Sequence, residues 1–229
     1  EPEPEPEPEA EPEAEPQPTL QEQLQLAADL TGTETALTAL FDLWGLEYRS
    51  GRGTGCAQAD AAGYACFYQR GSWSGLRQLD RPAVLTLTDA DGNTHQVVVT
   101  QILGDVAELS IAGVKVTHPI GDISELWFGQ FLLIWRPPNG EVVSLRVGTQ
   151  NDNVVWLRQS LASIDDRYRA EPVGSDYSDD ELADRVRDFQ RDKRIDVDGL
   201  AGQQTQIIIN SLLAIEGTPR LITPRLARD

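Results

Sequence analysis

The sequence predicts an α+β protein with two folded domains behind a proline-rich linker. Two amphipathic helical runs are followed by a block of short β-type runs, and the helical period returns after Gly148. Helices and strands in separate blocks, without strand–helix–strand alternation, are typical of the α+β class. The 229 residues, 40% of them hydrophobic, suffice for two domain cores. We expect a linker at 1–18, a first domain at 19–148 and a small three-helix domain at 149–229.

Residues 1–18 alternate Glu or Gln with Pro and Ala. Proline is excluded from helix interiors and the glutamates repel one another, so we expect an extended segment of about 3 Å per residue. We interpret it as a spacer between the folded part and a membrane. The alternative is a disordered segment without a distance role.

The charge of the chain limits its partners. Eight of the 37 acidic residues are glutamates among the first 15 positions, which leaves 29 acidic against 19 basic residues elsewhere. This excess of negative charge disfavours nucleic acid and anionic lipid as binding partners. No apolar run approaches the roughly 20 residues that span a bilayer, so no membrane insertion is expected. Because the chain begins with Glu and contains no Met, we expect a fragment whose upstream part includes any membrane helix.

Apolar spacing places the secondary structure. Two helical runs open the first domain, one with Leu20, Leu24, Leu26, Ala27 and Leu30, the other with Leu37, Leu40, Phe41 and Trp44. An antiparallel sheet is expected from strands at 84–88, 96–100, 106–109, 114–117, 131–135 and 142–147. Trp73 is expected in a loop, exposed for a partner. In the second domain, Ser178 and Glu181 form a capping-box pattern at the start of the middle helix.

Cys56 and Cys66 are the only cysteines, and His95 and His118 are the only histidines. No metal site is expected, because these residues form no cluster with ligand spacing. In an oxidising compartment a Cys56–Cys66 disulfide is expected, whereas in cytosol the two residues would be free thiols.

The C-terminal part resembles the peptidoglycan-binding domain of cell-wall hydrolases. The matching stretches are Val-Trp-Leu-Arg-Gln-Ser-Leu at 155–161, Val-Arg-Asp-Phe-Gln at 186–190 and Val-Asp-Gly-Leu-Ala-Gly-Gln-Gln-Thr at 197–205. The resemblance implies recognition of glycan or stem peptide. We expect Phe189 to pack in the core and the turn to the third helix to bind, through Asp198, Gly199 and the exposed Gln203, Gln204 and Thr205. One departure is the long acidic connection at 165–177, where the family has a short one.

The first domain resembles the papain-like cysteine peptidases that cleave leader peptides in bacteriocin exporters. The resemblance rests on Leu-Asp-Arg-Pro-Ala-Val-Leu at 79–85, His-Gln-Val-Val-Val at 95–99 and Glu-Leu-Trp-Phe-Gly-Gln-Phe at 125–131. The nucleophile position falls at Gly32 or its neighbour, without a cysteine. His118-Pro119 replaces the start of the acid motif. Since this catalysis needs a thiolate, an imidazole and an orienting group, we expect no peptidase activity and a relic His95.

The order of linker, inactive papain-like domain and peptidoglycan-binding domain is similar to the periplasmic region of the type II secretion ATPase family called GspA or ExeA. This resemblance implies an upstream ATPase, an inner-membrane tether, a GspB-like partner, help in assembling the secretin through the cell wall, and no cofactor. A homo-oligomer is left open. Two alternatives remain: a peptidoglycan-targeted peptidase with Cys56 as nucleophile beside His95, and a pure protein adaptor.

Overall fold

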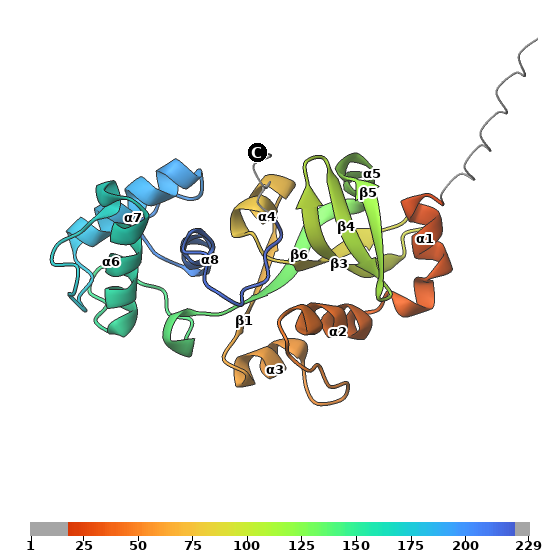
Figure 1. The fold of residues 1–229 in the computed structure, drawn as a ribbon, viewed down its shortest axis with the longest axis horizontal. Coiled ribbons are helices and arrows are strands. Elements are labelled where there is room, and N and C mark those ends of the chain that lie inside the picture. The colour runs from red at the N-terminus through yellow and green to blue at the C-terminus, as the bar shows by residue number, and fades with distance from the viewer. Residues whose placement is uncertain (1–17, 223–229) are drawn as a thin grey trace, which may run out of the picture.

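The computed structural model describes residues 18–222, which form a sheet domain and a helical domain lying end to end (Figure 1). The expected linker lies outside the described residues except for Pro18. The α+β class, with an antiparallel sheet followed by a small helical unit, is confirmed. Within residues 18–222, no helix has the length and apolar character needed to cross a membrane.

Six antiparallel strands form one sheet, in the order β1-β6-β2-β3-β4-β5. Five of the expected strands are present. The prediction of a sixth strand at 142–147 is wrong, because only Leu145 pairs there, in an isolated bridge to Ala201. An edge strand at 65–70 was not anticipated. The strands are β1 (Ala65–Arg70), β2 (Ala83–Thr88), β3 (Thr94–Leu103), β4 (Val106–Ile111), β5 (Val114–Pro119) and β6 (Trp127–Trp135).

Helices cover both faces of the sheet because its central strands are apolar on both sides. Val84, Val98 and Ile134 pack under α2 and α3, in a cluster with Leu40 and Phe41. The neighbouring strand positions turn to the other face, which is covered by α1, α4 and α5. The helices are α1 (Leu20–Leu26), α2 (Thr33–Leu43), α3 (Gly55–Ala61), α4 (Trp73–Leu79) and α5 (Ile120–Leu126), with short 3₁₀ turns η1 (Ala28–Leu30) and η2 (Pro138–Gly140).

The interpretation of Trp73 as a loop residue is wrong. Trp73 is the first residue of α4, after Ser72 as its N-cap. Its ring packs edge-on against Trp127 with the centroids 4.8 Å apart, and its indole N–H donates to Ser124 Oγ at 2.9 Å. The hydrogen bond and the ring contact hold Trp73 against the sheet domain.

The helical domain consists of α6 (Asp152–Ile164), η3 (Asp166–Tyr168), α7 (Asp180–Lys193) and α8 (Gln203–Leu212). Phe189 is completely buried, as expected. The prediction that Ser178 and Glu181 form a capping box is wrong. Asp179 caps α7 by accepting from Leu182 N, while the backbone of Ser178 is bonded to residues 148 and 149.

The two domains share one continuous core through α8, which lies beside α4 (Figure 1). Ser211 Oγ donates to the carbonyl of Leu79 at 2.7 Å, and Asn210 Nδ2 donates to the carbonyl of Arg136 at 2.9 Å. Both polar side chains are buried, so each hydrogen bond satisfies a group that would be costly to leave unpaired. The helical domain is therefore docked on the sheet domain.

After α8 the chain returns to the sheet domain and is fixed there by Asp80. This carboxylate, 4% exposed, accepts from Ile222 N at 2.7 Å and pairs with Arg220 at 2.6 Å. Ile102 N donates to the carbonyl of Leu221 at 2.8 Å, and the Leu221 side chain is fully buried. Residues 220–222 thus form a second attachment between the domains, which we call the C-terminal clamp.

The disulfide expected for an oxidising compartment is present. Cys56 lies in the first turn of α3 and is bonded to Cys66 of β1, with their Cα atoms 5.5 Å apart. The bond fixes α3 to the edge strand β1, which has β6 as its single partner strand in the described sheet.

We predict that replacing both cysteines by serine lowers the free energy of unfolding by about 2–3 kcal/mol, because the unfolded chain loses its closed loop. Urea denaturation of the oxidised wild type and the double variant measures this difference. The intact mass of the unreduced protein, lower by two hydrogen atoms, checks that the bond has formed. Equal midpoints for the two proteins would contradict the prediction.

Candidate functional site

The turn between α7 and α8 is built around the buried amide of Gln190. Its Oε1 accepts from the backbone N–H groups of Asp198, at 3.1 Å, and Gly199, at 2.9 Å. Its Nε2 donates to Asp198 Oδ1 at 2.8 Å and to the Leu200 carbonyl at 3.0 Å. Gly199 has φ +78°, and a Cβ there would lie 2.9 Å from the Arg187 guanidinium. Glycine adopts this left-handed conformation without strain, and the Arg187 guanidinium lies beside it.

The five predicted binding residues lie together at this turn, but two of them are not accessible. Gly199 is buried, and Thr205 is only 4% exposed. The expected exposure of Thr205 is wrong, because the residue faces inward from α8 and its hydroxyl lies 3.4 Å from Gln190 Nε2. Asp198 is exposed, while Gln203 and Gln204 are half-buried in the first turn of α8.

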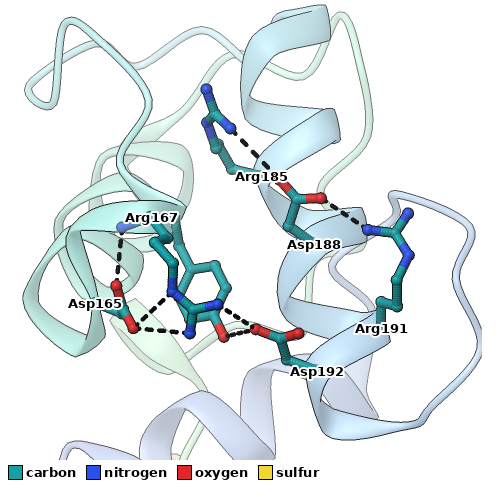
Figure 2. Close-up of polar contacts among 7 residues, drawn as sticks. Asp165, Arg167, Arg185, Asp188, Arg191 and Asp192 are labelled. Atoms are coloured by element: carbon teal, nitrogen blue, oxygen red, sulfur yellow. Dashed lines mark hydrogen bonds and ion pairs between the residues drawn. The ribbon is translucent and has the colours of Figure 1, made fainter.

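A second polar site lies elsewhere in the helical domain. There, charged side chains surround a shallow hollow of about 400 Å³ (Figure 2). We call it the arginine pocket. It belongs to the long connection between α6 and α7 and to α7 itself, and sequence analysis did not identify it. The lining residues are Asp166, Arg167, Tyr168, Arg169, Arg185, Asp188, Arg191 and Asp192.

Two aspartates of α7 organise the arginine pocket. Asp188 lies between Arg191, at 2.8 Å, and Arg185, at 3.4 Å, and Figure 2 shows the two guanidinium groups on either side of it. One turn further along, Asp192 accepts from the Tyr168 hydroxyl at 2.6 Å and pairs with Arg167 at 3.2 Å. The connection and the helix are thereby joined by charged hydrogen bonds.

The protonation states in this pocket are set by those contacts. Burial and the hydrogen bond to Asp192 raise the pKa of Tyr168 to about 12, so its hydroxyl stays a donor at neutral pH. The Tyr168 hydrogen bond lowers the pKa of Asp192, which stays ionised. The hydrogen bond from Arg167 lowers the pKa of Asp165 in the same way.

In the sheet domain, His95 has a partner on each ring nitrogen. Its Nδ1 is 2.8 Å from Thr31 Oγ1, and its Nε2 is 3.2 Å from Asp89 Oδ2. Burial raises the pKa of Asp89, but hydrogen bonds from Asn93, His95 and the Asp91 amide outweigh it and bring the pKa to about 2. The ionised carboxylate accepts from Nε2–H, and the Thr31 hydroxyl contacts Nδ1 while also lying 3.1 Å from the Ala28 carbonyl.

This arrangement corrects the expectation that the acid was lost. His118, at the expected acid motif, contacts Gln23 instead, but Asp89 supplies a carboxylate to His95 from the β2–β3 hairpin. Thr31, the neighbour of Gly32, stands where the nucleophile was expected. The side chains of Thr31, His95 and Asp89 are enclosed, with each residue at most 6% exposed. Within residues 18–222, no three His, Cys, Asp or Glu side chains gather as metal ligands.

A family model describes part of the helical domain. Residues 150–209 match the putative peptidoglycan binding domain. The matched range contains the Gln190-centred turn and the arginine pocket.

Two curated relatives match most of the chain. General secretion pathway protein A of Aeromonas hydrophila is 28% identical over 192 residues, or 82% of this chain. The chain is similar to General secretion pathway protein A over most of its length. A putative protein of the same name from Escherichia coli K12 is 26% identical over 75% of the chain. The predicted resemblance to GspA or ExeA is thus confirmed, and the chain spans about a third of the length of these relatives.

A solved structure shares the fold. It is a periplasmic domain of the EpsAB fusion protein of the Vibrio vulnificus type II secretion system. The TM-score is 0.53 at 24% identity, and the match covers 85% of this chain and 83% of that one.

We predict that Asp89 makes the protein sensitive to acid. A carboxyl with a lowered folded pKa stabilises the fold above its ordinary value of 3.8, and that contribution is lost as the pH falls toward about 2. Asp89→Asn should lower stability at pH 7 and flatten its dependence on pH between these values. Denaturation at several pH values tests this, with the exposed Asp91→Asn of the same hairpin as control. A parallel pH curve for Asp89→Asn would refute it.

Proposed function

We propose that the chain is a periplasmic module of type II secretion that binds peptidoglycan through its helical domain. The observation that carries this proposal is the match of residues 150–209 to a peptidoglycan-binding domain within a chain similar to General secretion pathway protein A. The Cys56–Cys66 disulfide favours an oxidising compartment, in agreement with a periplasmic location.

The proposed glycan-binding surface is the Gln190-centred turn with the start of α8. Asp198, Gln203 and Gln204 offer polar groups there, while Gly199 and Thr205 support the turn from inside. A shallow polar surface of this kind relies on several hydrogen bonds, each worth about 0.5–1.5 kcal/mol net. Binding by one domain should therefore be weak, and tethering to a membrane should strengthen it.

The finer assignments are part of the same proposal. We propose a linker at 1–18, a sheet domain at 19–148 and a peptidoglycan-binding domain at 149–229. The solved relative is described as part of an EpsAB fusion protein, which supports a GspB-like partner for this chain. Tethering to the inner membrane and help in assembling the secretin through the wall complete the proposal.

The sheet domain is proposed to be non-catalytic. Thr31 and His95 form a hydroxyl–imidazole pair with Asp89 behind it, but their enclosure leaves no room for a substrate carbonyl beside the hydroxyl. The rival nucleophile, Cys56, is bonded to Cys66 and has no thiol. We propose that this domain instead makes contacts with other proteins.

We predict that the purified chain co-sediments with sacculi and that Gln203→Ala with Gln204→Ala reduces the bound fraction several-fold. The two side chains lie on the proposed surface and take no part in the turn, so circular dichroism should show unchanged helices. Replacing Gln25 and Gln150, outside the proposed surface, by alanine serves as a matched control. Wild-type protein that stays in the supernatant would instead support a pure protein adaptor.

We also predict that the chain does not hydrolyse peptides. A peptide library incubated with the native protein and analysed by mass spectrometry should remain intact, before and after reduction of the disulfide. Cleavage that disappears in His95→Ala but persists in His118→Ala would overturn the assignment and revive the peptidase alternative.

A further inference from the structure

Four of the chain's 19 basic residues line the arginine pocket, although the protein has a net charge of −18. Two of them, Arg167 and Arg169, come from the connection between α6 and α7, and Arg185 and Arg191 come from α7. The connection that departs from the family pattern therefore brings arginine side chains to a defined hollow, where three aspartates also lie and each arginine already pairs with a carboxylate. Among the lining residues arginines outnumber carboxylates, whereas in the whole chain carboxylates are in excess and would repel an anionic ligand.

The guanidinium groups of α7 retain donors for a ligand. Arg191 has one ion-pair partner within the described residues, a single oxygen of Asp188, and its side chain is 63% exposed. Arg185 reaches the other oxygen of Asp188 through one terminal nitrogen, and its Nε donates to the Arg169 carbonyl. Each guanidinium carries five N–H groups in a planar fork, so a carboxylate can still be bound by two of them.

The pocket is also held in place before any ligand arrives. Tyr168 is 3% exposed, and its ring packs edge-on against Phe189 at 5.4 Å, while its hydroxyl is bonded to Asp192. Arg167 is fixed by two hydrogen bonds to one oxygen of Asp165, at 2.9 and 3.1 Å (Figure 2). Fixed side chains reduce the entropy lost on binding.

We propose that the arginine pocket binds carboxylate groups of the stem peptides of peptidoglycan. The glycan sugars offer mostly neutral hydroxyl and acylamino groups, whereas the stem peptides carry carboxylates that match the arginine forks. The exposed Asp166 and the half-exposed Asp192 provide acceptors for an ammonium group on the same peptide. This inference rests on the proposed function and assigns the peptide part of the wall to one surface and the sugar part to another.

The test compares two soluble fragments: a disaccharide tetrapeptide released from sacculi, and the same disaccharide without its peptide and with its lactyl carboxylate converted to the amide. Calorimetry on the full chain should give tighter binding of the peptide-bearing fragment. In Arg185→Gln with Arg191→Gln, its Kd should rise about tenfold or more, and the preference over the peptide-free fragment should vanish. Amidating the peptide carboxylates should have the same effect on the wild type.

Arg49→Gln is the control, because it also removes an exposed arginine ion pair, here with Glu47, but in the sheet domain, outside both proposed surfaces. It should keep the preference for the peptide-bearing fragment. Wild-type protein that binds sacculi but does not distinguish the two fragments would overturn the pocket and leave the proposed function intact. The same holds if Arg49→Gln abolishes the preference as fully as the pocket variant. Failure to bind sacculi at all would overturn both.

Discussion

The buried amide of Gln190 is the contact on which the helical domain depends. It bonds two backbone N–H groups and two acceptors of a turn whose further backbone pairing includes the bridge between Ala201 and Leu145. Without these bonds the buried polar groups of the turn, such as the Gly199 N–H, would be unpaired, each at a cost of about 1–3 kcal/mol. Because the turn sets the start of α8, it also sets where Asn210 and Ser211 meet the sheet domain.

Helix α8 therefore contributes both to the proposed binding surface and to the contact with the sheet domain. Its first turn presents Gln203 and Gln204 outward, while its last turns are buried against α4 and the end of β6. The arginine pocket takes no residue from α8, because it is built on α7 and the connection before it. The domain thus offers two polar surfaces without giving up its contact with the sheet.

Periodicity predicted those elements in which burial follows the spacing. Leu37, Leu40, Phe41 and Trp44 are all buried on α2 or at its end, as their spacing indicated. The spacing predicted too long a buried face for the first helix. Helix α1 ends at Leu26, and that residue is 84% exposed. Strand β1 was not predicted because only Ala65 of its six residues is buried, so the strand carries no alternating pattern of buried apolar residues.

The candidate site was predictable only in part, for a physical reason. Sequence motifs placed the turn at 197–205, but whether Thr205 faces inward depends on the phase of α8, which Gln190 fixes from another helix. Asp89 lies six positions before His95, across a hairpin, and no motif linked the two. The arginine pocket combines residues from two segments of the domain, and their approach is a property of packing.

The C-terminal clamp changes how the two domains share a mechanical load. The chain crosses from sheet to helices once after β6 and comes back at residues 220–222, where Asp80 and Ile102 fasten it. A pull applied to the helical domain is therefore carried by two attachments in parallel, together with the face of α8. Parting the domains requires shearing all three at once, so a wall fragment held by the helices would drag the sheet domain with it as a single body.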